Sequence, residues 1–251
     1  MRTIRLMATQ VRLENRAFWR NPAAAFFTVI FPLVFMVIAN VALAGSAGGP
    51  EAAARFYTPA IMAFALITAC YTNLAMGVVV ARDAGILKRL RGTPLPTWIY
   101  LWGRIAESVL IAALIVGVVA VYGALAHGVL LPGDHLAALA VTLLIGAAAF
   151  SALGLAVSGL VPNAGAAPAV VNATILPLLL ISDVLIPIDD PTLSAIARLF
   201  PVRHLAQALA VAYDPAVAGF GFAWDSLAIV GAWGIAGLVI ALATFSWQPR
   251  G

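Results

Sequence analysis

The chain has 251 residues, of which 63% are hydrophobic and only 10% are charged, and its formal net charge is +4. Soluble domains carry about 25% charged residues, so this composition excludes an ordinary water-soluble fold. The apolar surplus makes membrane-spanning helices the natural units of one membrane domain over residues 1–251. The single cysteine, Cys70, lies in an apolar run, where we interpret it as a packing residue.

The first segment, residues 1–22, has the pattern of an amphipathic helix that lies along the membrane surface. Polar residues recur on one face at helical spacing, and apolar residues recur on the other. The polar face holds Arg5, Thr9, Arg12, Arg16 and Arg20, and the apolar face holds Ile4, Met7, Val11 and Phe18. Amphipathicity alone serves either a topology anchor or a contact with a partner subunit, so both interpretations stay open.

Six apolar runs predict six membrane-spanning helices, because about 20 apolar residues cross a bilayer core and a helix satisfies its own backbone polar groups. They cover residues 24–44, 56–81, 105–126, 136–161, 166–187 and 225–245. The fifth run contains Pro177, which predicts a kink, and Asp225 is placed to cap the sixth helix. The expected fold is therefore an all-α integral membrane protein with six transmembrane helices.

Basic residues are distributed unevenly between the two sides of these spans. Most of the basic residues lie on one side of the spans. The other side receives most of the acidic residues and only three basic ones, Arg55, Arg198 and Arg203. Because Lys and Arg are retained in the cytoplasm, both termini should be cytoplasmic, and topology explains the positive charge better than nucleic-acid binding. An alanine-rich chain with one lysine suggests a bacterial gene, and hence the bacterial inner membrane. The predicted cytoplasmic residues are Arg2, Arg5, Arg12, Arg16, Arg20, Arg82, Lys88, Arg89, Arg91, Arg104 and Arg250.

The segment 188–224, between the fifth and sixth spans, predicts two helices that are too short to cross the membrane. Asp190 can cap the first, with Pro191 at its first position, and Asp214 closes the second. We expect this pair to form a re-entrant element in the outer leaflet. Charged residues are costly in hydrocarbon, so those of this segment should face water, headgroups or carboxylates. The basic residues in question are Arg198, Arg203 and His204, and the carboxylates that they could face are those of Asp183, Asp189 and Asp190.

The loop 82–104 joins the second and third spans and contains a predicted short helix closed by Gly92, which Pro94 prevents from continuing. Apolar and basic residues interleave in this helix, so one side can be buried while the other meets water or acidic groups. By chemistry alone, a positive-inside loop is the simpler interpretation. The residues of the helix are Gly85, Ile86, Leu87, Lys88, Arg89, Leu90 and Arg91.

The same loop is specific enough to compare with known proteins, because Arg82 to Leu95 reads RDAGILKRLRGTPL and Tyr100 to Arg104 reads YLWGR. It resembles the cytoplasmic loop of type-2 ATP-binding cassette (ABC) exporter permeases, particularly the daunorubicin-resistance branch. The chain departs from that family at Ala81, where Glu is frequent, and at Ile86, where Thr is frequent. Further matches are Arg20-Asn21-Pro22, Phe31-Pro32, Phe200 to Leu205 and Phe245-Ser246-Trp247.

The resemblance implies that Gly85 to Arg91 form a coupling helix seated in a groove of a separate ATP-binding subunit. It also implies that residues 2–20, with Arg12, Arg16 and Arg20, form a connecting helix beside it. Two permeases, identical or homologous, would assemble with two such subunits, which would carry the ATP and Mg, while lipids surround the spans. Cargo would pass at the permease interface, lined mainly by spans one, two and five.

Independently of the resemblance, the chain lacks a P-loop, which needs Gly-Lys-Ser/Thr, because its only lysine, Lys88, follows Leu87. Energy must then come from another polypeptide or from an ion gradient, so a secondary carrier is the alternative function and an intramembrane hydrolase a weaker one. An ion-driven carrier would place carboxylates deep in a span, and Glu107 is the only acidic residue clearly within one. An ion pair with Arg104, one turn earlier, is the simpler interpretation.

Polar residues within the spans are candidates for contact with cargo, although hydrogen bonds between helices explain them equally well. Small residues such as Gly154, Gly231 and Gly237 predict close helix packing. The histidines lack the spacing of a zinc site, so we expect no metal and no catalytic residue. The apolar lateral surface favours an amphipathic cargo, such as a drug, a lipid or a glycolipid. The candidate cargo contacts are Thr68, Tyr71, Thr72, Asn73, Asn172 and Thr174.

Overall fold

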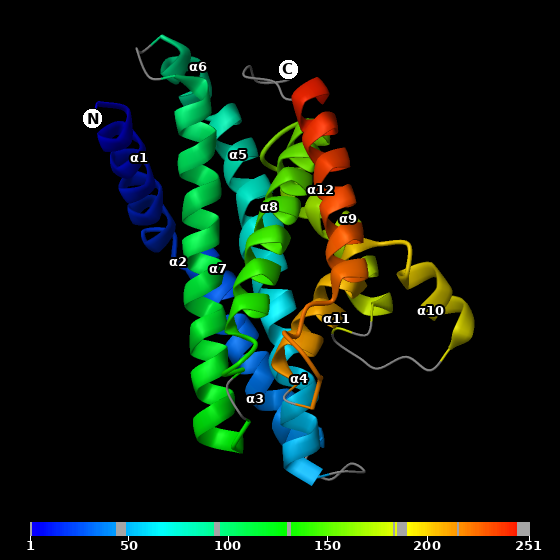
Figure 1. Ribbon diagram of the computed structural model, residues 1–251. Helices are drawn as coiled ribbons and strands as arrows, with labels where there is room; N and C mark the ends of the chain where they lie inside the picture. Colours follow the sequence, from blue (N-terminus) through cyan, green and yellow to red (C-terminus); the bar gives the residue numbers. More distant parts are fainter. Residues whose placement is uncertain are drawn as a thin grey trace.

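The chain folds as a bundle of helices in the computed structural model (Figure 1). The structure describes residues 2–43, 49–92, 96–129, 132–182, 184, 190–214 and 216–244, and these ranges contain helices and turns but no β-strand. The predicted all-α fold is therefore confirmed. In chain order the elements are α1 (Arg2–Trp19), α2 (Pro22–Ala25), η1 (Phe26–Ile30), α3 (Phe31–Leu43), α4 (Gly49–Ile67), η2 (Thr68–Asn73), α5 (Leu74–Asp83), α6 (Ile86–Arg91), α7 (Thr97–His127), α8 (Leu136–Leu160), α9 (Ala167–Ile181), α10 (Pro191–Ala197), α11 (Pro201–Tyr213) and α12 (Trp224–Thr244).

Five stretches of the described chain are long and apolar enough to cross a membrane, which makes this a multi-pass membrane protein. They correspond to the predicted spans one to four and six. Asp225 lies in the first turn of α12, which begins at Trp224, so it places negative charge at the helix N-terminus and is not the predicted cap. The five stretches are Pro22–Ala39, Ala54–Asp83, Trp98–His127, Leu136–Leu160 and Trp224–Thr244.

The helix of the predicted fifth span, 166–187, is shorter than the sequence pattern predicts. α9 has 15 residues, which include Pro177. At 1.5 Å per residue it is about 22 Å long, less than the bilayer core of about 30 Å. The helix stops at Ser182, whose hydroxyl donates to the carbonyl oxygen of Leu179 at 3.2 Å. Residues 183 and 185–187 of the predicted span lie outside the described residues.

Exposed basic side chains lie toward one end of the bundle. Figure 1 shows α1, α6 and the C-terminal end of α12 at one end, whereas the end of α3 and the start of α4 lie at the other. The exposed basic residues of α1 and α6 therefore gather at one end of the molecule, as the distribution of charge along the chain predicts. Among them are Arg5, Arg12, Arg16, Lys88 and Arg89.

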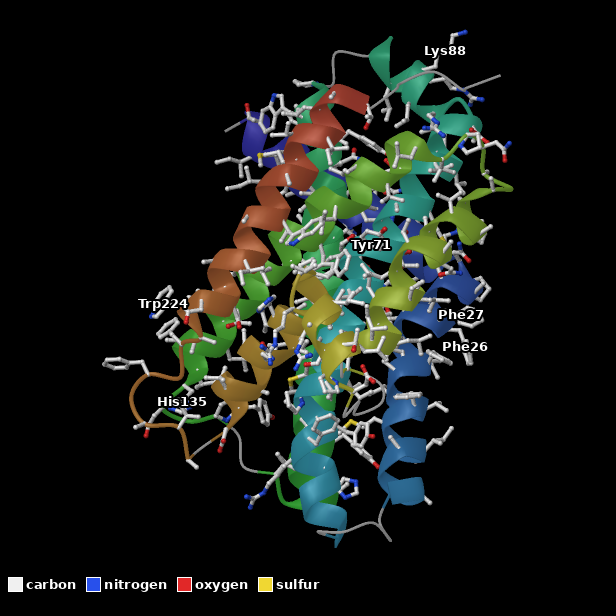
Figure 2. The ribbon with its side chains drawn as sticks, turned by 90° about the vertical axis from the view of Figure 1, so that its right-hand side faces the viewer. Phe26, Phe27, Tyr71, Lys88, His135 and Trp224 are labelled. Carbon is white, nitrogen blue, oxygen red and sulfur yellow. The ribbon has the colours of Figure 1, made fainter. Side chains whose placement is uncertain are left out.

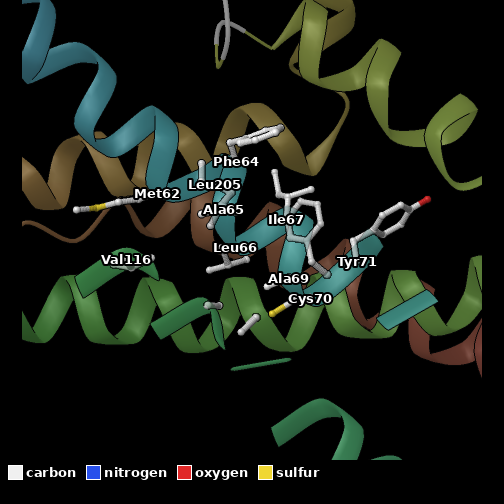
Figure 3. Close-up of a cluster of buried hydrophobic side chains, with 14 of the residues drawn as sticks. Met62, Phe64, Ala65, Leu66, Ile67, Ala69, Cys70, Tyr71, Val116 and Leu205 are labelled. Carbon is white, nitrogen blue, oxygen red and sulfur yellow. The ribbon is translucent and has the colours of Figure 1, made fainter. Parts of the chain in front are cut away.

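The continuous stretch α4–η2–α5 forms the centre of the bundle, where α7, α8 and α11 pack against it. Met62, Leu66 and Ile67 are fully buried there and form part of the cluster in Figure 3. Cys70 belongs to the same cluster and is a fully buried free thiol, which agrees with its predicted packing role. The middle of the stretch, η2, is a π-helix, a wide turn that is frequent at functional sites and that the sequence pattern does not reveal.

Glycines let α8 approach its neighbours closely. A Cβ atom at Gly154 would lie 2.9 Å from the carbonyl oxygen of Tyr71, and one at Gly237 would lie 2.9 Å from the backbone nitrogen of Leu153. The packing role predicted for these two glycines is thus confirmed. The same prediction is wrong for Gly231, where an added Cβ would meet no atom within 4 Å.

The two short helices predicted between the last spans are α10 and α11. Asp190 caps α10 as predicted, with Oδ1 accepting hydrogen bonds from the amides of Thr192 at 2.8 Å and Leu193 at 2.9 Å. α10 projects sideways from the bundle (Figure 1). In contrast, α11 packs against α4, α8 and α12 and contributes to the central core. Of the two helices, α10 therefore protrudes from the bundle and α11 is part of its core.

The environment of His204 differs from the prediction that it faces water, headgroups or carboxylates. The side chain is only 8% exposed, and its Nε2 lies 2.8 Å from the carbonyl oxygen of Arg198. Packing of α11 into the bundle carries this histidine inward. Arg203 donates from Nη1 to the hydroxyl of Ser194 at 2.7 Å, while the Arg198 side chain is exposed as expected. The predicted partners outside the described residues are Asp183 and Asp189.

The close packing of α8 on η2 predicts that Gly154→Ala destabilises the bundle while Gly117→Ala does not. The added methyl group at 154 would press on backbone carbonyls of η2, and overpacking costs about 1–3 kcal/mol. Gly117 has open space around its Cβ position on α7, and alanine is the better helix former. Thermal unfolding of both purified variants in detergent measures the difference. An unchanged midpoint for Gly154→Ala would contradict this packing.

Candidate coupling surface and transport groove

The short helix α6 begins and ends at glycines at one end of the bundle. Gly85 has φ +68°, a left-handed conformation that favours glycine, and its carbonyl oxygen accepts from the amide of Arg89 at 3.1 Å. At the other end, the amide of Gly92 donates to the carbonyl oxygen of Arg89 at 3.0 Å. The turn at Gly85 redirects the chain out of α5, so α6 stands as a separate helix at the end of that span.

One side of α6 is anchored inside the protein. Leu87 is fully buried in a small cluster with Ala81 of α5 and Tyr100 of α7, and Leu90 packs partly against the same cluster. Apolar burial therefore holds α6 against both helices that it connects. A substitution at Leu87 would disturb this anchor before it tested any outside contact.

The other side of α6 is uncovered. Ile86 is 44% exposed, and Lys88 and Arg89 are exposed beside it. Figure 2 shows Lys88 at the extreme end of the molecule, pointing away from the bundle. The side chain of Arg91, also predicted to belong to this surface, lies outside the described residues. We call Ile86, Lys88 and Arg89 the coupling surface.

The residues just before α6 tie α5 to the connection between α8 and α9. Arg82 is 1% exposed, and its Nη1 donates to the carbonyl oxygen of Ser158 at 3.0 Å while Nη2 donates to that of Val161. The carboxylate of Asp83 accepts from the amide of Ala164. Charge-assisted hydrogen bonds of this kind are strong, so the base of α6 and the start of α9 are held together.

α1 packs along α7 through a close contact at Gly103, where a Cβ atom would overlap the side chain of Gln10. Phe18 is buried at the end of this interface. Ile4, predicted on the same apolar face, is 72% exposed because it lies at the far end of α1. The polar face of α1 is exposed, as predicted, at Arg5, Thr9, Arg12 and Arg16, and Arg20 is also exposed.

An ion pair joins α1 to α7. Arg104 donates from Nη1 to Oε2 of Glu14 at 2.9 Å, and Gln10 donates from Nε2 to Glu14 Oε1 at 2.7 Å. Both charged side chains are largely buried, at 16% and 11% exposed. This corrects the predicted ion pair between Arg104 and Glu107: among the described residues, the salt bridge of Arg104 is with Glu14. The folded position of α1 brings in a carboxylate that is distant in sequence.

A groove of about 920 Å³ opens beside this ion pair. α1, α2, η1 and α3 form one wall, α4, η2 and α5 form another, and α9, the first turns of α7 and Ile86 of α6 complete it. Apart from α1 and α6, these elements belong to the predicted spans one, two and five, together with the start of span three and the loop before it. Phe27, which lines the groove, points outward from the bundle at its edge (Figure 2).

Four of the six candidate cargo contacts line the groove, namely Thr68, Thr72, Asn73 and Asn172. The other two, Tyr71 and Thr174, form a hydrogen bond with each other at 2.6 Å and are not among its lining residues. The Tyr71 ring projects away from the buried cluster of η2 in Figure 3. For these two residues the structure therefore favours the alternative explanation, a hydrogen bond between η2 and α9.

A family model described as ABC-2 type transporter matches residues 6–213 of the chain. The chain belongs to the ABC-2 type transporter family. None of the curated proteins matches it. An ABC-2 permease is the membrane component of a transporter, is not itself the catalyst, and normally pairs with an ATP-binding subunit. Within the part of the chain that the structure describes, no three His, Cys, Asp or Glu side chains are placed to hold a metal ion.

Several features of this ABC-2 permease escaped sequence reasoning. Glu14 is the only acidic residue of the amphipathic helix, and that isolation was the available signal for a partner outside α1. Phe27 and Phe31 line the groove, but in sequence they are two aromatic residues in an apolar run. The role of Arg82 was hidden because its partners are backbone carbonyls, which any residue carries.

The ion pair between α1 and α7 predicts that Arg104→Gln loosens α1 in the permease. Breaking a buried pair by removing one partner costs roughly 3–5 kcal/mol, and even a third of that would speed amide exchange about tenfold. Hydrogen–deuterium exchange of residues 2–19 measures this. Arg12→Gln, at an exposed position of α1, is the matched control and should leave exchange unchanged. Equal exchange in both variants would show that the ion pair does not hold α1.

Proposed function

We propose that the chain is the permease subunit of an ABC exporter, which moves an amphipathic drug, lipid or glycolipid out of the cytoplasm or the inner leaflet. A separate subunit binds ATP and Mg and hydrolyses the ATP. The observation that carries this proposal is the geometry of α6, a short helix with one side buried in the permease and its basic side uncovered. Family membership supports the transport role.

Residues Gly85 to Arg91 act as the coupling helix, and the coupling surface enters a groove of the ATP-binding subunit. An apolar side chain beside two cations suits an apolar pocket with an acidic rim, because electrostatic complementarity fixes orientation and register. Ile86 supplies the apolar contact, and Lys88 and Arg89 supply the charges. Leu87 and Leu90 anchor the helix and transmit its displacement to α5 and α7.

Displacement of α6 reaches two walls of the groove. α6 follows directly from α5, which lines the groove, and the Arg82 and Asp83 contacts tie its base to the segment that leads into α9. α1 serves as the connecting helix and exposes Arg12, Arg16 and Arg20. Since packed helices move as rigid elements, closure of two ATP-binding subunits would change the width of the groove.

The assembly contains two permeases, this chain with a second copy or a homologue, and two ATP-binding subunits. The first span leaves large apolar side chains uncovered, with Phe27 at 60% and Ile38 at 58% exposed. Such a surface must face lipid or another apolar protein surface. The two grooves would face each other at the permease interface, and lipids would cover the remaining apolar sides.

The end of the bundle that carries α1 and α6 faces the cytoplasm of a bacterium, across the inner membrane. The exposed basic side chains at this end support that orientation through the positive-inside rule. Both termini are then cytoplasmic, and ATP reaches its subunit on the side where α6 is displayed. The helix pair α10 and α11 lies in the outer half of the membrane.

Reversing the charge of the coupling surface should disrupt its interaction with the ATP-binding subunit without unfolding the permease. In the triple variant Ile86→Asp, Lys88→Glu, Arg89→Glu, acidic groups would meet the acidic rim, and we expect loss of co-purification of the ATP-binding subunit or at least about a tenfold drop in its permease-stimulated ATPase rate. Pull-down and ATPase assays measure both. All three side chains are exposed, so folding should be preserved.

Arg198→Glu is the matched control, because it reverses an exposed charge on α10, away from α6. It should leave ATPase stimulation intact. Full ATPase stimulation by the triple variant would contradict the coupling assignment. Uptake of tetraphenylphosphonium driven by a proton gradient, without ATP or a partner subunit, would favour the ion-driven carrier instead.

The orientation predicts opposite labelling of two introduced cysteines in intact cells. After Cys70→Ala, a cysteine at exposed Asp134, between α7 and α8, should react with a membrane-impermeant maleimide. A cysteine at Arg89 should react only after permeabilisation. Gel-shift detection of the labelled permease distinguishes the two. Labelling at 89 but not at 134 in intact cells would reverse the orientation.

A further inference from the structure

We infer that Glu107 gives the groove a binding site for a positively charged group, such as the ammonium of an amphipathic molecule. The inference rests on the proposed function, because it names the charge of the cargo that this groove admits. Glu107 is a buried carboxyl group, and its expected partner, Arg104, forms a salt bridge with Glu14 instead. The groove is where a cation can reach it.

Glu107 is buried in the membrane part of the chain and still lines the groove. Its side chain is 2% exposed, and it lies ten residues after Thr97 on α7, about 15 Å along the helix axis. Its Oε1 atom has no hydrogen-bond partner among the described residues. Buried carboxylates are normally paired, and ionisable residues within spans face a bundle interior or a cavity where they meet a partner.

Arg104 is held in a position that serves Glu14. Its guanidinium donates to Glu14 at 2.9 Å, lies 6.0 Å from the centre of the Tyr100 ring, and occupies the space that a Cβ atom at Gly77 would fill. Contacts from α1, α5 and α7 therefore fix this cation. The salt bridge with Glu14 leaves Glu107 without a salt bridge among the described residues.

The net charge of the groove is the sum of the charges of its lining residues. Its charged lining residues, within the described part of the chain, are Glu14, Glu107 and Arg104. With both carboxylates ionised, two negative charges and one positive charge leave a net charge of −1. In a low-dielectric groove an added cation is attracted and an added anion is repelled, and neither effect is screened as it would be in water.

The rest of the groove suits the apolar body of such a molecule. Phe27, Phe31 and Phe64 present aromatic rings, which bind apolar groups and attract cations over their faces. Asn73 and Asn172 add amide groups for neutral polar substituents. A volume of about 920 Å³ is within the range of pockets for drug-sized ligands. With Glu107 ionised, the site therefore combines one negative charge with a large apolar surface.

Two probes of similar shape and opposite charge test the inference, namely tetraphenylphosphonium and tetraphenylborate. Saturable binding of each to the full-length permease in lipid nanodiscs is measured by equilibrium dialysis, with empty nanodiscs subtracted. Glu107→Gln should weaken tetraphenylphosphonium binding about tenfold, the effect of one charge contact worth about 1.4 kcal/mol. The same substitution should leave tetraphenylborate binding unchanged or strengthened. Glu107→Asp, which keeps the charge, should retain most of the cation binding.

Asp225→Asn is the matched control, because it removes an exposed acidic group of α12 that does not line the groove. It should leave the binding of both probes unchanged. Wild-type binding of tetraphenylphosphonium by Glu107→Gln would overturn the inference, and it would indicate that Glu107 is protonated in the groove. Equal loss of both probes in Glu107→Gln and Glu107→Asp would also overturn it, by showing a packing role.

The experiment separates this inference from the proposed function, since the binding assay contains neither ATP nor an ATP-binding subunit. Failure of the cation test would leave coupling through Ile86, Lys88 and Arg89 as it stands. Failure of ATPase stimulation by the wild-type complex would overturn the exporter and leave the cation site intact.

Discussion

Polar groups that lie among apolar membrane helices must find partners inside the protein, because hydrocarbon offers none. Arg82 reaches backbone carbonyls at the end of α8, and Arg104 reaches the carboxylate of Glu14. Tyr71 bonds to Thr174 across the bundle. Each contact joins elements that are distant in sequence. The positions of α1, α8 and α9 around the central stretch α4–η2–α5 are thus fixed by polar pairing as well as by apolar burial.

This constraint also relates the coupling surface to the groove. α6 is anchored by Leu87 between α5 and α7, and the adjacent Arg82 holds the start of the α8–α9 connection. Arg104 joins α1 to α7, and Arg82 and Asp83 join α5 to the segment between α8 and α9, so α6 is rigidly connected to helices that line the groove. Glu107 stands apart, since it is buried in the groove without a described hydrogen-bond partner at Oε1.

Much of the fold could be predicted from the chain itself. Apolar runs of sufficient length located five stretches of spanning length, and the cap at Asp190 located α10. The interleaved apolar and basic residues and the closing Gly92 located α6, because these are local features, although the helix begins at Ile86 and not at Gly85. The candidate site was predicted less well. Four of its polar lining residues were recognised, but the aromatic ones and Glu14 were not, because nothing local distinguishes them.

The sequence by itself determined the all-α membrane class, the unequal charge of the two ends and the residues of α6. These depend on length, hydropathy and spacing along one segment, which local physics fixes. Only the tertiary structure decided which side of α6 is free, that His204 is buried, and that Arg104 pairs with Glu14. The ion-pair partner of a buried residue depends on which helices pack together. A close contact at a glycine, such as Gly103 against Gln10, determines how α1 and α7 pack. Likewise, only the tertiary structure places Glu107 in the groove.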